Sequence, residues 1–303
     1  MFNKILNVEG DEGQSIPLII DSPHSGTEYP LDFNHQADLV KLRQAEDTYV
    51  NELYEYVSSI GGVFIEAKFP RSYIDPNRSE SDFIFEDLKE TNNNACEIKF
   101  NPTIKSELGI GLIWLRIPPN GEPMYKDKIT LKSLMNRVNI YHRPYHKTLK
   151  NKLSETYRKF GKFYHVNAHS MQNQATAMSD QSQGTIRPDF VIGDREGTSC
   201  KRRFTDLIVD FLRGLNYSVD INYPYKGMEL VKAYSDPLEN KNSVQIEVNR
   251  KLYMNEETRE KTKNFKILQK DLEKLINEIR NQYDEGYLWM KLVYKVKKTI
   301  LYQ

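Results

Sequence analysis

Two segments far apart in the chain end a short apolar run with a histidine and then a serine. Residues 17–26 contain His24 in this position, and residues 163–171 contain His169. A short buried strand that ends in a polar residue delivers that residue to the end of the strand, where open α/β sheets place their sites. Two histidines presented in this way, together with one carboxylate, would supply the three protein ligands of a catalytic metal ion.

The third ligand should be an acidic residue, and Asp47 is the best placed. It stands in the first turn of a helix predicted over 46–60 and shares a face with Val50 and Tyr54, so that it points toward the core. Glu46 is the neighbouring alternative. A structural interpretation stays open, in which Asp47 or Glu46 only complements the positive end of the helix dipole.

Zinc is the metal that this ligand set favours, with one ion per chain, because zinc accepts imidazole and carboxylate ligands and keeps a fourth position for water. Such a site needs a proton shuttle, and Glu247 is the candidate. Strand alternation puts Glu247 on the face opposite the apolar Ile246 and Val248. A carboxylate inside a buried strand is costly unless it has a partner or a function. A salt bridge to Arg250 or Arg78 is the structural alternative.

The remaining periodicities predict the elements that must position these residues. Strands are expected at 17–20, 63–69, 111–117, 163–168, 189–192, 217–221 and 244–248, and helices at 46–60, 128–160 with a disturbance at Pro144, 199–215 and 256–282. Alternating strands and helices favour an α/β fold with a parallel or mixed sheet covered on both faces. No repeat, linker or shift in composition divides the chain, so we expect a single domain over 1–303.

Composition narrows the class of protein further. The 303 residues are 39% hydrophobic and 28% charged, as expected of a globular protein with a sizeable core. A formal net charge of +1 provides no global field to attract nucleic acid or an anionic membrane. The two cysteines, Cys96 and Cys200, are too few for a disulfide framework, so free thiols and a cytoplasmic location are expected. Neither a secretory signal nor a membrane-spanning run is recognisable.

Several short motifs follow one another along residues 17–255. They are Ser22-Pro23-His24-Ser25-Gly26 with Tyr29-Pro30, Asp47-Thr48-Tyr49-Val50-Asn51-Glu52-Leu53-Tyr54, Arg71-Ser72-Tyr73-Ile74-Asp75-Pro76-Asn77-Arg78, Tyr145-His146, Ala168-His169-Ser170-Met171, Pro188-Asp189-Phe190-Val191-Ile192-Gly193, Asn222-Tyr223-Pro224-Tyr225-Lys226-Gly227 and Gln245-Ile246-Glu247-Val248-Asn249-Arg250. Any one of them is weak. The ordered set resembles the N-formylglutamate amidohydrolase family.

The resemblance implies a fold and a reaction. The fold would be that of the zinc carboxypeptidases (phosphorylase/hydrolase-like), a three-layer α/β/α arrangement with a mixed central sheet of about eight strands. His24, Asp47 and His169 would hold the zinc ion. Glu247 would be the general base that takes a proton from zinc-bound water and passes it to the leaving amine. The reaction would be hydrolysis of N-formyl-L-glutamate to formate and L-glutamate, the last step of one route of histidine degradation.

The implied substrate is a small acidic N-acyl amino acid, and arginine binds a carboxylate with two parallel hydrogen bonds. Arg71 and Arg78 bracket a turn after a strand and are the predicted anchors. One of them, for which we take Arg71, could instead polarise the scissile carbonyl and so act in catalysis. A structural pair with Asp75 is the alternative for either arginine. The other predicted substrate contacts are Asn77, His146 (alternatively a core histidine) and Lys226.

The chain departs from the family pattern at three positions. Asn167 stands where the family usually has an acidic residue, two before the second metal histidine. A carboxylate there would orient the histidine and raise its basicity, so weaker metal binding is expected. Met228 replaces the second of two frequent glycines, and Lys232 replaces a frequent arginine. The last change concerns the substrate site and leaves open another acyl amino acid or a carboxypeptidase-like reaction.

Other classes of function fit less of the sequence. Ser25 and Ser170 lack a glycine-flanked nucleophile elbow, and Cys200 has no motif that pairs it with a base. The aromatic and lysine-rich segment 287–298 could contact nucleic acid or a membrane surface, but we expect it to pack on the domain with its lysines in water. A non-catalytic, ligand-binding family member is the more serious rival. The chain is expected to be a monomer or a homodimer.

Overall fold

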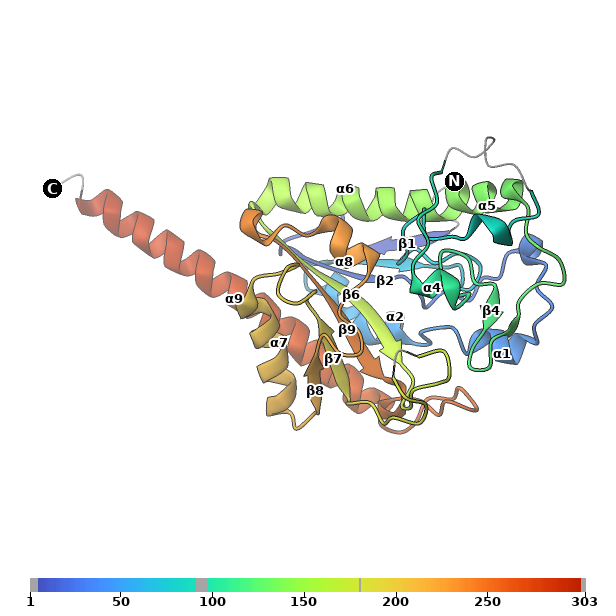
Figure 1. Cartoon of the computed structure of the whole chain (residues 1–303). Coiled ribbons are helices and arrows are strands. Elements are labelled where there is room, and N and C mark those ends of the chain that lie inside the picture. Colours follow the sequence, from blue (N-terminus) through green and yellow to red (C-terminus); the bar gives the residue numbers. More distant parts are fainter. Residues whose placement is uncertain (1–4, 91–97, 180, 301–303) are drawn as a thin grey trace.

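Six of the predicted strands and a further strand, β1, form one central sheet of seven strands, in the order β1-β3-β2-β6-β9-β7-β8 (Figure 1). The structure is a computed structural model that describes residues 5–90, 98–179 and 181–300, with side chains up to residue 282. The strands are β1 (Leu6–Glu9), β2 (Leu18–Ser22), β3 (Val63–Ala67), β6 (Phe163–Met171), β7 (Phe190–Gly193), β8 (Val219–Ile221) and β9 (Lys241–Asn249), with β4 (Arg116–Ile117) and β5 (Glu122–Pro123) forming a separate pair. β3, β2, β6 and β9 run parallel, whereas β1 and β7 are antiparallel to their neighbours β3 and β9.

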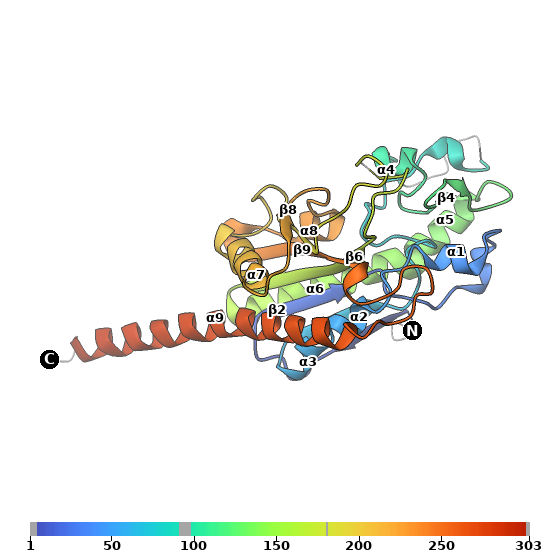
Figure 2. The ribbon, with the colours of Figure 1, turned by 90° about the horizontal axis from the view of Figure 1, so that it is seen from below.

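Helices cover both faces of the sheet. They are α1 (Leu39–Arg43), α2 (Val50–Tyr54), α3 (Tyr56–Ser59), α4 (Ile104–Glu107), α5 (Leu131–Arg137), α6 (Arg143–Phe160), α7 (Arg202–Gly214), α8 (Glu229–Tyr234) and α9 (Phe265–Ile300). Successive strand residues point to opposite faces, so Leu18 and Ile20 pack with α2, α7 and α9, while Ile19 packs in the core that contains α5, α6 and α8. Figure 2 shows the resulting layers from below. The predicted three-layer α/β/α class is confirmed.

Two strand predictions need correction. The predicted strand at 111–117 is wrong, because only Arg116–Ile117 forms a strand, while Leu112 and Ile113 are buried in a loop. A short apolar run reports burial and does not identify the hydrogen-bonding partner, so it fits a buried loop as well as a strand. The edge strand β1 was not predicted. The central sheet therefore has seven strands and not about eight.

The helix predicted over 46–60 begins later than expected. Tyr49 has a left-handed backbone with φ 65°, so α2 starts at Val50 and continues into α3. Asp47 accordingly lies in the turn before the helix and not in its first turn. This placement matters for the site, because the amide of Asp47 donates a hydrogen bond of 3.0 Å to the carbonyl oxygen of His24.

The helical region predicted over 128–160 is interrupted as expected. A π-helical turn over Val138–His142 separates α5 from α6, and Pro144 stands in the first turn of α6. Proline has no N–H to donate to the preceding turn, and its ring crowds the carbonyl four residues earlier. A widened turn next to proline relieves that conflict. The interruption is therefore confirmed, although it falls just before the proline.

The C-terminal helix α9 covers one face of the sheet. It starts at residue 265 instead of 256 and packs against α2, α3 and α7, with Leu272 and Ile276 in the core (Figures 1 and 2). Both views show the end of α9 extending past the sheet. The side chains of segment 287–298 lie outside the described residues, so its predicted packing stays a prediction. The same holds for the single domain over 1–303.

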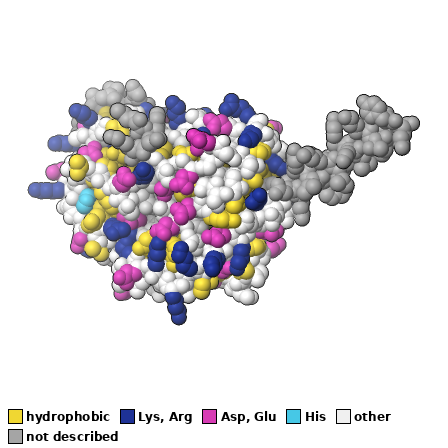
Figure 3. Space-filling view, turned by 180° about the vertical axis from the view of Figure 1, so that it is seen from behind, with side chains coloured by type: hydrophobic (Ala, Val, Ile, Leu, Met, Phe, Trp, Pro, Cys, Tyr) yellow, Lys and Arg dark blue, Asp and Glu magenta, His cyan; other side chains and the backbone are white. Residues whose placement is uncertain are grey.

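The surface carries charges of both signs. On the face seen from behind in Figure 3, lysine and arginine side chains are interspersed with aspartate and glutamate, and hydrophobic side chains form small groups. This distribution agrees with the formal net charge of +1. Within the described residues we find no helix that combines the length and the apolar character needed to cross a membrane.

Candidate metal centre and active site

Three neighbouring strands in the middle of the sheet carry polar side chains on one face. These buried residues are Asp21 on β2, His165, Asn167 and His169 on β6, and Ser243, Gln245 and Glu247 on β9. The strand register sets Asp21 beside Asn167 and His169 beside Glu247. Alternation therefore places them on the same face, within the layer covered by α6 and α8. Burying so many polar groups costs free energy unless each has a partner, which points to a functional site.

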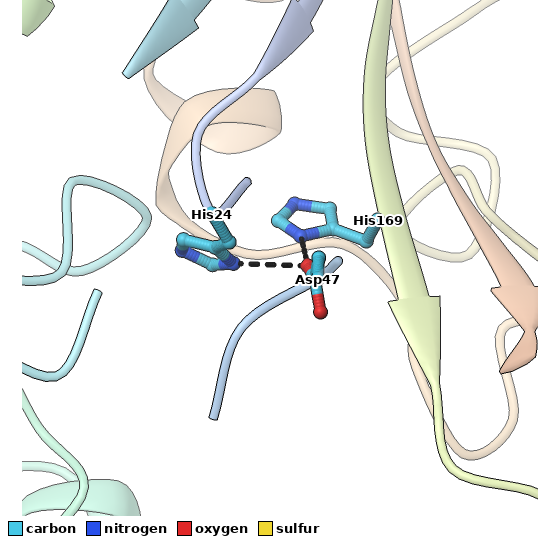
Figure 4. Close-up of side chains that lie close together, drawn as sticks. All are labelled: His24, Asp47 and His169. Carbon is cyan, nitrogen blue, oxygen red and sulfur yellow. Dashed lines mark hydrogen bonds and ion pairs between the residues drawn. The ribbon is translucent and has the colours of Figure 1, made fainter. Parts of the chain in front are cut away.

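His24, Asp47 and His169 converge beside this polar face (Figure 4). Each offers one ligand atom, and the three atoms lie within 4.8 Å of one another. Asp47 Oδ2 is 3.3 Å from His24 Nδ1 and 3.0 Å from His169 Nδ1. All three side chains are buried. The structure thus brings together the three residues predicted to bind the metal.

The loop after β2 is built to hold His24 against Asp47. Ser25 Oγ donates a hydrogen bond of 3.2 Å to the carbonyl oxygen of Asp47. A Cβ atom at Gly26 would lie 2.3 Å from the carbonyl oxygen of Phe69. Only glycine allows the backbone to approach so closely. The serine and glycine of the first motif therefore position the histidine.

Asp75 fixes the orientation of the His24 ring. Its Oδ1 lies 2.7 Å from His24 Nε2, and its Oδ2 accepts a hydrogen bond of 2.8 Å from Arg71 Nη2. Burial opposes ionisation of Asp75, but Arg71, His24 and Arg78 hold its pKa well below the usual range. An ionised Asp75 accepts the Nε2–H of His24. His24 Nδ1 is then the ring nitrogen that faces Asp47, and it is a buried atom without a hydrogen-bond partner.

His169 and Asp47 also each direct an atom with a lone pair into the group. Burial lowers the pKa of His169 to about 4, so its imidazole is neutral and offers a lone pair. Asp47 is held as a carboxylate, because Arg250 Nη2 and Ser170 Oγ donate to its Oδ1 at 3.1 and 3.2 Å. Its Oδ2 is left to face the two histidines. Two imidazoles and a carboxylate, each oriented by a further partner, fit the ligand set of a zinc ion.

Glu46, the alternative ligand, faces away from the histidines. Its carboxylate accepts hydrogen bonds from Tyr29 Oη at 2.6 Å and Arg259 Nη2 at 2.5 Å, and it lies 3.3 Å from Arg43 Nε. These partners compensate a buried charge and link the turn before α2 to the segment before α9. The structure therefore assigns Asp47, and not Glu46, to the histidine group.

Glu247 lies next to His169 in the strand register and is buried. Gln245 Nε2 donates a hydrogen bond of 2.8 Å to its Oε1. Burial and the charge of Asp47 raise the pKa of Glu247 to about 8. Arg250, one partner considered for Glu247, binds Asp47 instead. Glu247 thus has the raised pKa and the position that suit a group exchanging protons near neutral pH.

The turn after β3 carries both predicted arginines. Arg71 donates to Asp75 and lies over the Trp114 ring, 5.0 Å from its centroid. Arg78 is buried, its Nη1 donates to the Asn77 carbonyl at 3.1 Å, and its Nε has no hydrogen-bond partner. Asn77 itself reaches the cluster, with Nδ2 at 3.1 Å from His169 Nε2. Arg71 is therefore the structural partner of Asp75, and Arg78 keeps an unused donor.

Two predicted substrate contacts lie outside this cluster. The ring nitrogens of His146 contact the Pro76 carbonyl oxygen at 2.8 Å and Tyr234 Oη at 2.7 Å. Burial lowers the pKa of His146 to about 3, so the neutral ring supports the backbone of the arginine turn. Lys226 is half-exposed and its Nζ lies 3.3 Å from Glu196. Lys232 is also exposed, on α8, so this departure from the family pattern lies on the surface.

The alternative nucleophiles have structural roles. Ser25 and Ser170 both hydrogen-bond to Asp47, and Ser170 also accepts from Arg250. Burial raises the pKa of the Cys200 thiol to about 12, which leaves it protonated and unreactive. Cys96 lies outside the described residues.

Sequence reasoning missed Asp21, which accepts from Asn167 on the neighbouring strand, and Gln245, which donates to Glu247 on the same strand. A signal was available, because His165, Asn167 and His169 alternate with apolar residues on a strand whose two faces were both expected to be buried. It also assigned no role to Tyr225. The Arg187 guanidinium lies over the Tyr225 ring, 5.3 Å from the ring centroid, and burial raises the pKa of Tyr225 to about 12.

At the level of class, this architecture is that of a hydrolase with a mixed-sheet α/β fold. The family model described as N-formylglutamate amidohydrolase matches residues 16–254. The chain therefore belongs to the N-formylglutamate amidohydrolase family, whose reaction cleaves an amide bond. The resemblance noted in the sequence is confirmed.

Individual relatives agree with this assignment. The chain is 26% identical over 250 residues to an N-formylglutamate deformylase of Pseudomonas putida, covering 80% of this chain and 83% of that protein. It is 25% identical over 248 residues to an N-formylglutamate deformylase of Pseudomonas aeruginosa, covering 80% and 84%. The crystal structure of N-formylglutamate amidohydrolase from Ralstonia eutropha JMP134 superimposes with a TM-score of 0.87 at 40% identity, covering 93% of this chain and 99% of that one.

The raised pKa of Glu247 predicts a pH-dependent stability of the metal-free protein. The folded-state pKa of about 8 exceeds the ordinary value of 4.5. Glu247 therefore does not reduce the free energy of unfolding below about pH 4.5, and it reduces it progressively as the pH rises from 4.5 toward 8. Glu247→Gln cannot ionise. Its free energy of unfolding should therefore exceed that of the wild type by roughly 2–4 kcal/mol at pH 8 and by much less at pH 5.

Urea denaturation between pH 5 and pH 8, in the presence of a chelator, measures this difference. Glu122→Gln, at an exposed position paired with Lys41, is the control and should change stability by no more than about 0.5 kcal/mol at any pH. A gap between Glu247→Gln and wild type that stays constant with pH would contradict the shift.

Proposed function

We propose that the protein hydrolyses N-formyl-L-glutamate to formate and L-glutamate, with one water molecule consumed. The observation that carries this proposal is the position of Glu247 directly beside the His24–Asp47–His169 group. The similarity to a solved N-formylglutamate amidohydrolase and to two deformylases of that name supports the choice of substrate. Histidine degradation, a cytoplasmic location and the monomeric or dimeric state stay predictions.

We propose that the group takes one zinc ion per chain, which His24, His169 and Asp47 would hold. Zinc in such a site supplies Lewis acidity, which lowers the pKa of a water molecule and polarises a carbonyl group. The protein contributes the orientation of the ligands, because Asp75 and Asn167 accept from the Nε2 atoms of the two histidines at 2.7 Å each. Arg250 and Ser170 hold the Asp47 carboxylate.

Glu247 moves the proton in this proposal. Its carboxylate takes a proton from the attacking water and gives it to the amine nitrogen of glutamate as the C–N bond breaks. Without a metal ion, burial and Asp47 keep its pKa near 8. A divalent cation held by the neighbouring ligands offsets the Asp47 charge and favours the ionised base. Gln245 orients the carboxylate through Oε1.

The two arginines recognise the acidic substrate. Arg78 has a buried guanidinium with an unused Nε donor, which suits a substrate carboxylate. Arg71 is held by Asp75 and Trp114, and its charge acts on both Asp47 and Glu247. This position also suits stabilisation of the oxyanion that develops on the scissile carbonyl. A panel of N-acyl amino acids separates formylglutamate from other acyl amino acids as the preferred substrate.

The first test is removal of a metal ligand. Purified wild-type protein should contain about one zinc ion per chain and release formate from N-formylglutamate. His169→Ala should lose both, because two ligands do not retain the metal. Metal analysis and a formate assay measure the two quantities. His35→Ala is the control, since His35 contacts the Ala37 carbonyl outside the cluster and should keep both. Full zinc content and turnover in His169→Ala would remove this ligand from the proposal.

The second test separates the base from the metal. Glu247→Gln should keep its zinc and lose turnover by about 10²–10⁴-fold, the range that a general base contributes. Glu66→Gln is the control, because Glu66 is a half-buried strand carboxylate that accepts from Asn7 at 3.3 Å, outside the cluster. It should keep near-normal turnover. Unchanged turnover in Glu247→Gln would exclude Glu247 from proton transfer.

The third test concerns substrate recognition. Arg71→Ala and Arg78→Ala should each raise KM for acidic substrates by about tenfold or more, since a hydrogen bond to a charged group is lost. Neutral N-acyl amino acids should be affected less. Steady-state kinetics on both substrate classes measure this bias, with Arg202→Ala, an exposed partner of Asp206, as the control. Equal effects on acidic and neutral substrates would show that neither arginine binds the substrate carboxylate.

A further inference from the structure

Asp21 is a buried carboxylate that the proposed reaction does not use. It accepts three hydrogen bonds: from Tyr145 Oη at 2.6 Å, His165 Nε2 at 2.8 Å and Asn167 Nδ2 at 2.8 Å. Burial opposes its ionisation, but His165, Tyr145 and Asn167 together lower its pKa. A carboxylate that receives three donors acts only as an acceptor. The amide of Asn167 must therefore present its NH₂ group, and not its oxygen, to Asp21.

The orientation of the Asn167 amide also determines which atom it presents to the metal group. With Nδ2 directed at Asp21, the Oδ1 atom of Asn167 points the other way and lies 2.7 Å from His169 Nε2. An amide oxygen can only accept, so the short contact requires a proton on Nε2. A neutral imidazole with its proton on Nε2 carries its lone pair on Nδ1, the atom that faces Asp47.

Asn77 reinforces the same orientation. Its Oδ1 accepts from the amide of Leu230 at 3.0 Å, so its Nδ2 faces Asn167 Oδ1 at 3.3 Å and His169 Nε2 at 3.1 Å. If the Asn167 amide turned over, its NH₂ group would face the NH₂ group of Asn77. Asn77 could also donate to an unprotonated Nε2, which would favour the opposite tautomer. The shorter contact to Asn167 decides for Nε2–H.

We propose that Asp21 and Asn167 are positioning residues that set the tautomer of His169, so that its Nδ1 lone pair is ready for a metal ion before the ion binds. Asp21 acts through the Asn167 amide and touches neither ligand nor substrate. The inference rests on the proposed function only for the identity of the metal.

The first experiment reads the tautomer in the zinc-free wild-type protein. Two-bond ¹H–¹⁵N correlation spectra of protein labelled on histidine distinguish the two neutral forms, and His169→Gln identifies the signals of His169 by their loss. We expect the proton on Nε2. A proton on Nδ1 overturns the proposal. This measurement needs no change to the site and no substrate.

The second experiment measures zinc affinity by competition with a chelator. Asp21→Leu, which has a similar size and no acceptor, should weaken zinc binding by about tenfold or more, because the Asn167 amide loses the partner that fixes it. Tyr145→Phe is the matched control, since it removes a hydrogen bond from Oδ2 of the same buried carboxylate and leaves the contact with Asn167. It should change the Kd for zinc by less than about threefold, although both variants lose thermal stability.

Equal zinc affinity in Asp21→Leu and wild type would contradict the proposed role of Asp21 and Asn167, and so would an equal weakening of zinc binding in Tyr145→Phe. If Asp21→Leu does not fold, the tautomer spectrum of the wild type decides alone. The two proposals fail separately. A wild type that hydrolyses no N-formylglutamate contradicts the proposed function, whereas the tautomer and the zinc affinity test only the positioning pair.

Discussion

Burial of the Asp47 charge is the constraint on which the rest of the site depends. A carboxylate removed from water is tolerated only when its oxygens are matched by donors. Here Arg250 and Ser170 donate hydrogen bonds to one oxygen of Asp47, and the other oxygen faces His24 and His169. These partners come from the loop after β2, the end of β6 and the segment after β9. One buried charge therefore fixes the relative positions of three segments that are far apart in the chain.

The buried carboxylates of the site divide into two groups by their surroundings. Asp21, Asp47 and Asp75 are buried, but each has several donors or cationic neighbours, and each has a pKa below the usual range. Glu247 is equally buried, has the Asp47 charge as its neighbour and one amide donor, and has a pKa of about 8. When surroundings shift the pKa values of neighbouring groups in opposite directions, the groups take different roles. Here the low pKa values mark the structural charges, and the raised pKa marks the proton-transferring group. The polar face of the sheet thus provides both ligand orientation and acid–base chemistry.

Local patterns were reliable where burial and periodicity coincide. The strands β2, β3, β6 and β9 and the helix α7 lie close to where alternation and helical spacing put them. The strand at 111–117 failed because apolar residues such as Leu112 and Ile113 are buried in a loop, and burial alone does not specify a hydrogen-bonding partner. The helix at 46–60 starts late because Tyr49 adopts a left-handed conformation, which no propensity of tyrosine indicates. Edge strand β1 carries too little apolar pattern to be recognised.

The sequence by itself determined the chemical types at the site: two histidines and a serine-containing motif at strand ends, an acidic pair at 46 and 47, and a glutamate within an apolar strand. These follow from local order along the chain. Only the tertiary structure decided between Asp47 and Glu46 as the carboxylate of the histidine group. It also paired Arg250 with Asp47 and placed the Asp47 charge near Glu247. It directed His146 to the Pro76 carbonyl and linked Asp21 through Asn167 to His169. The physical reason is that a buried polar group is defined by its partners, and those partners come from segments whose proximity is created by sheet register and loop packing.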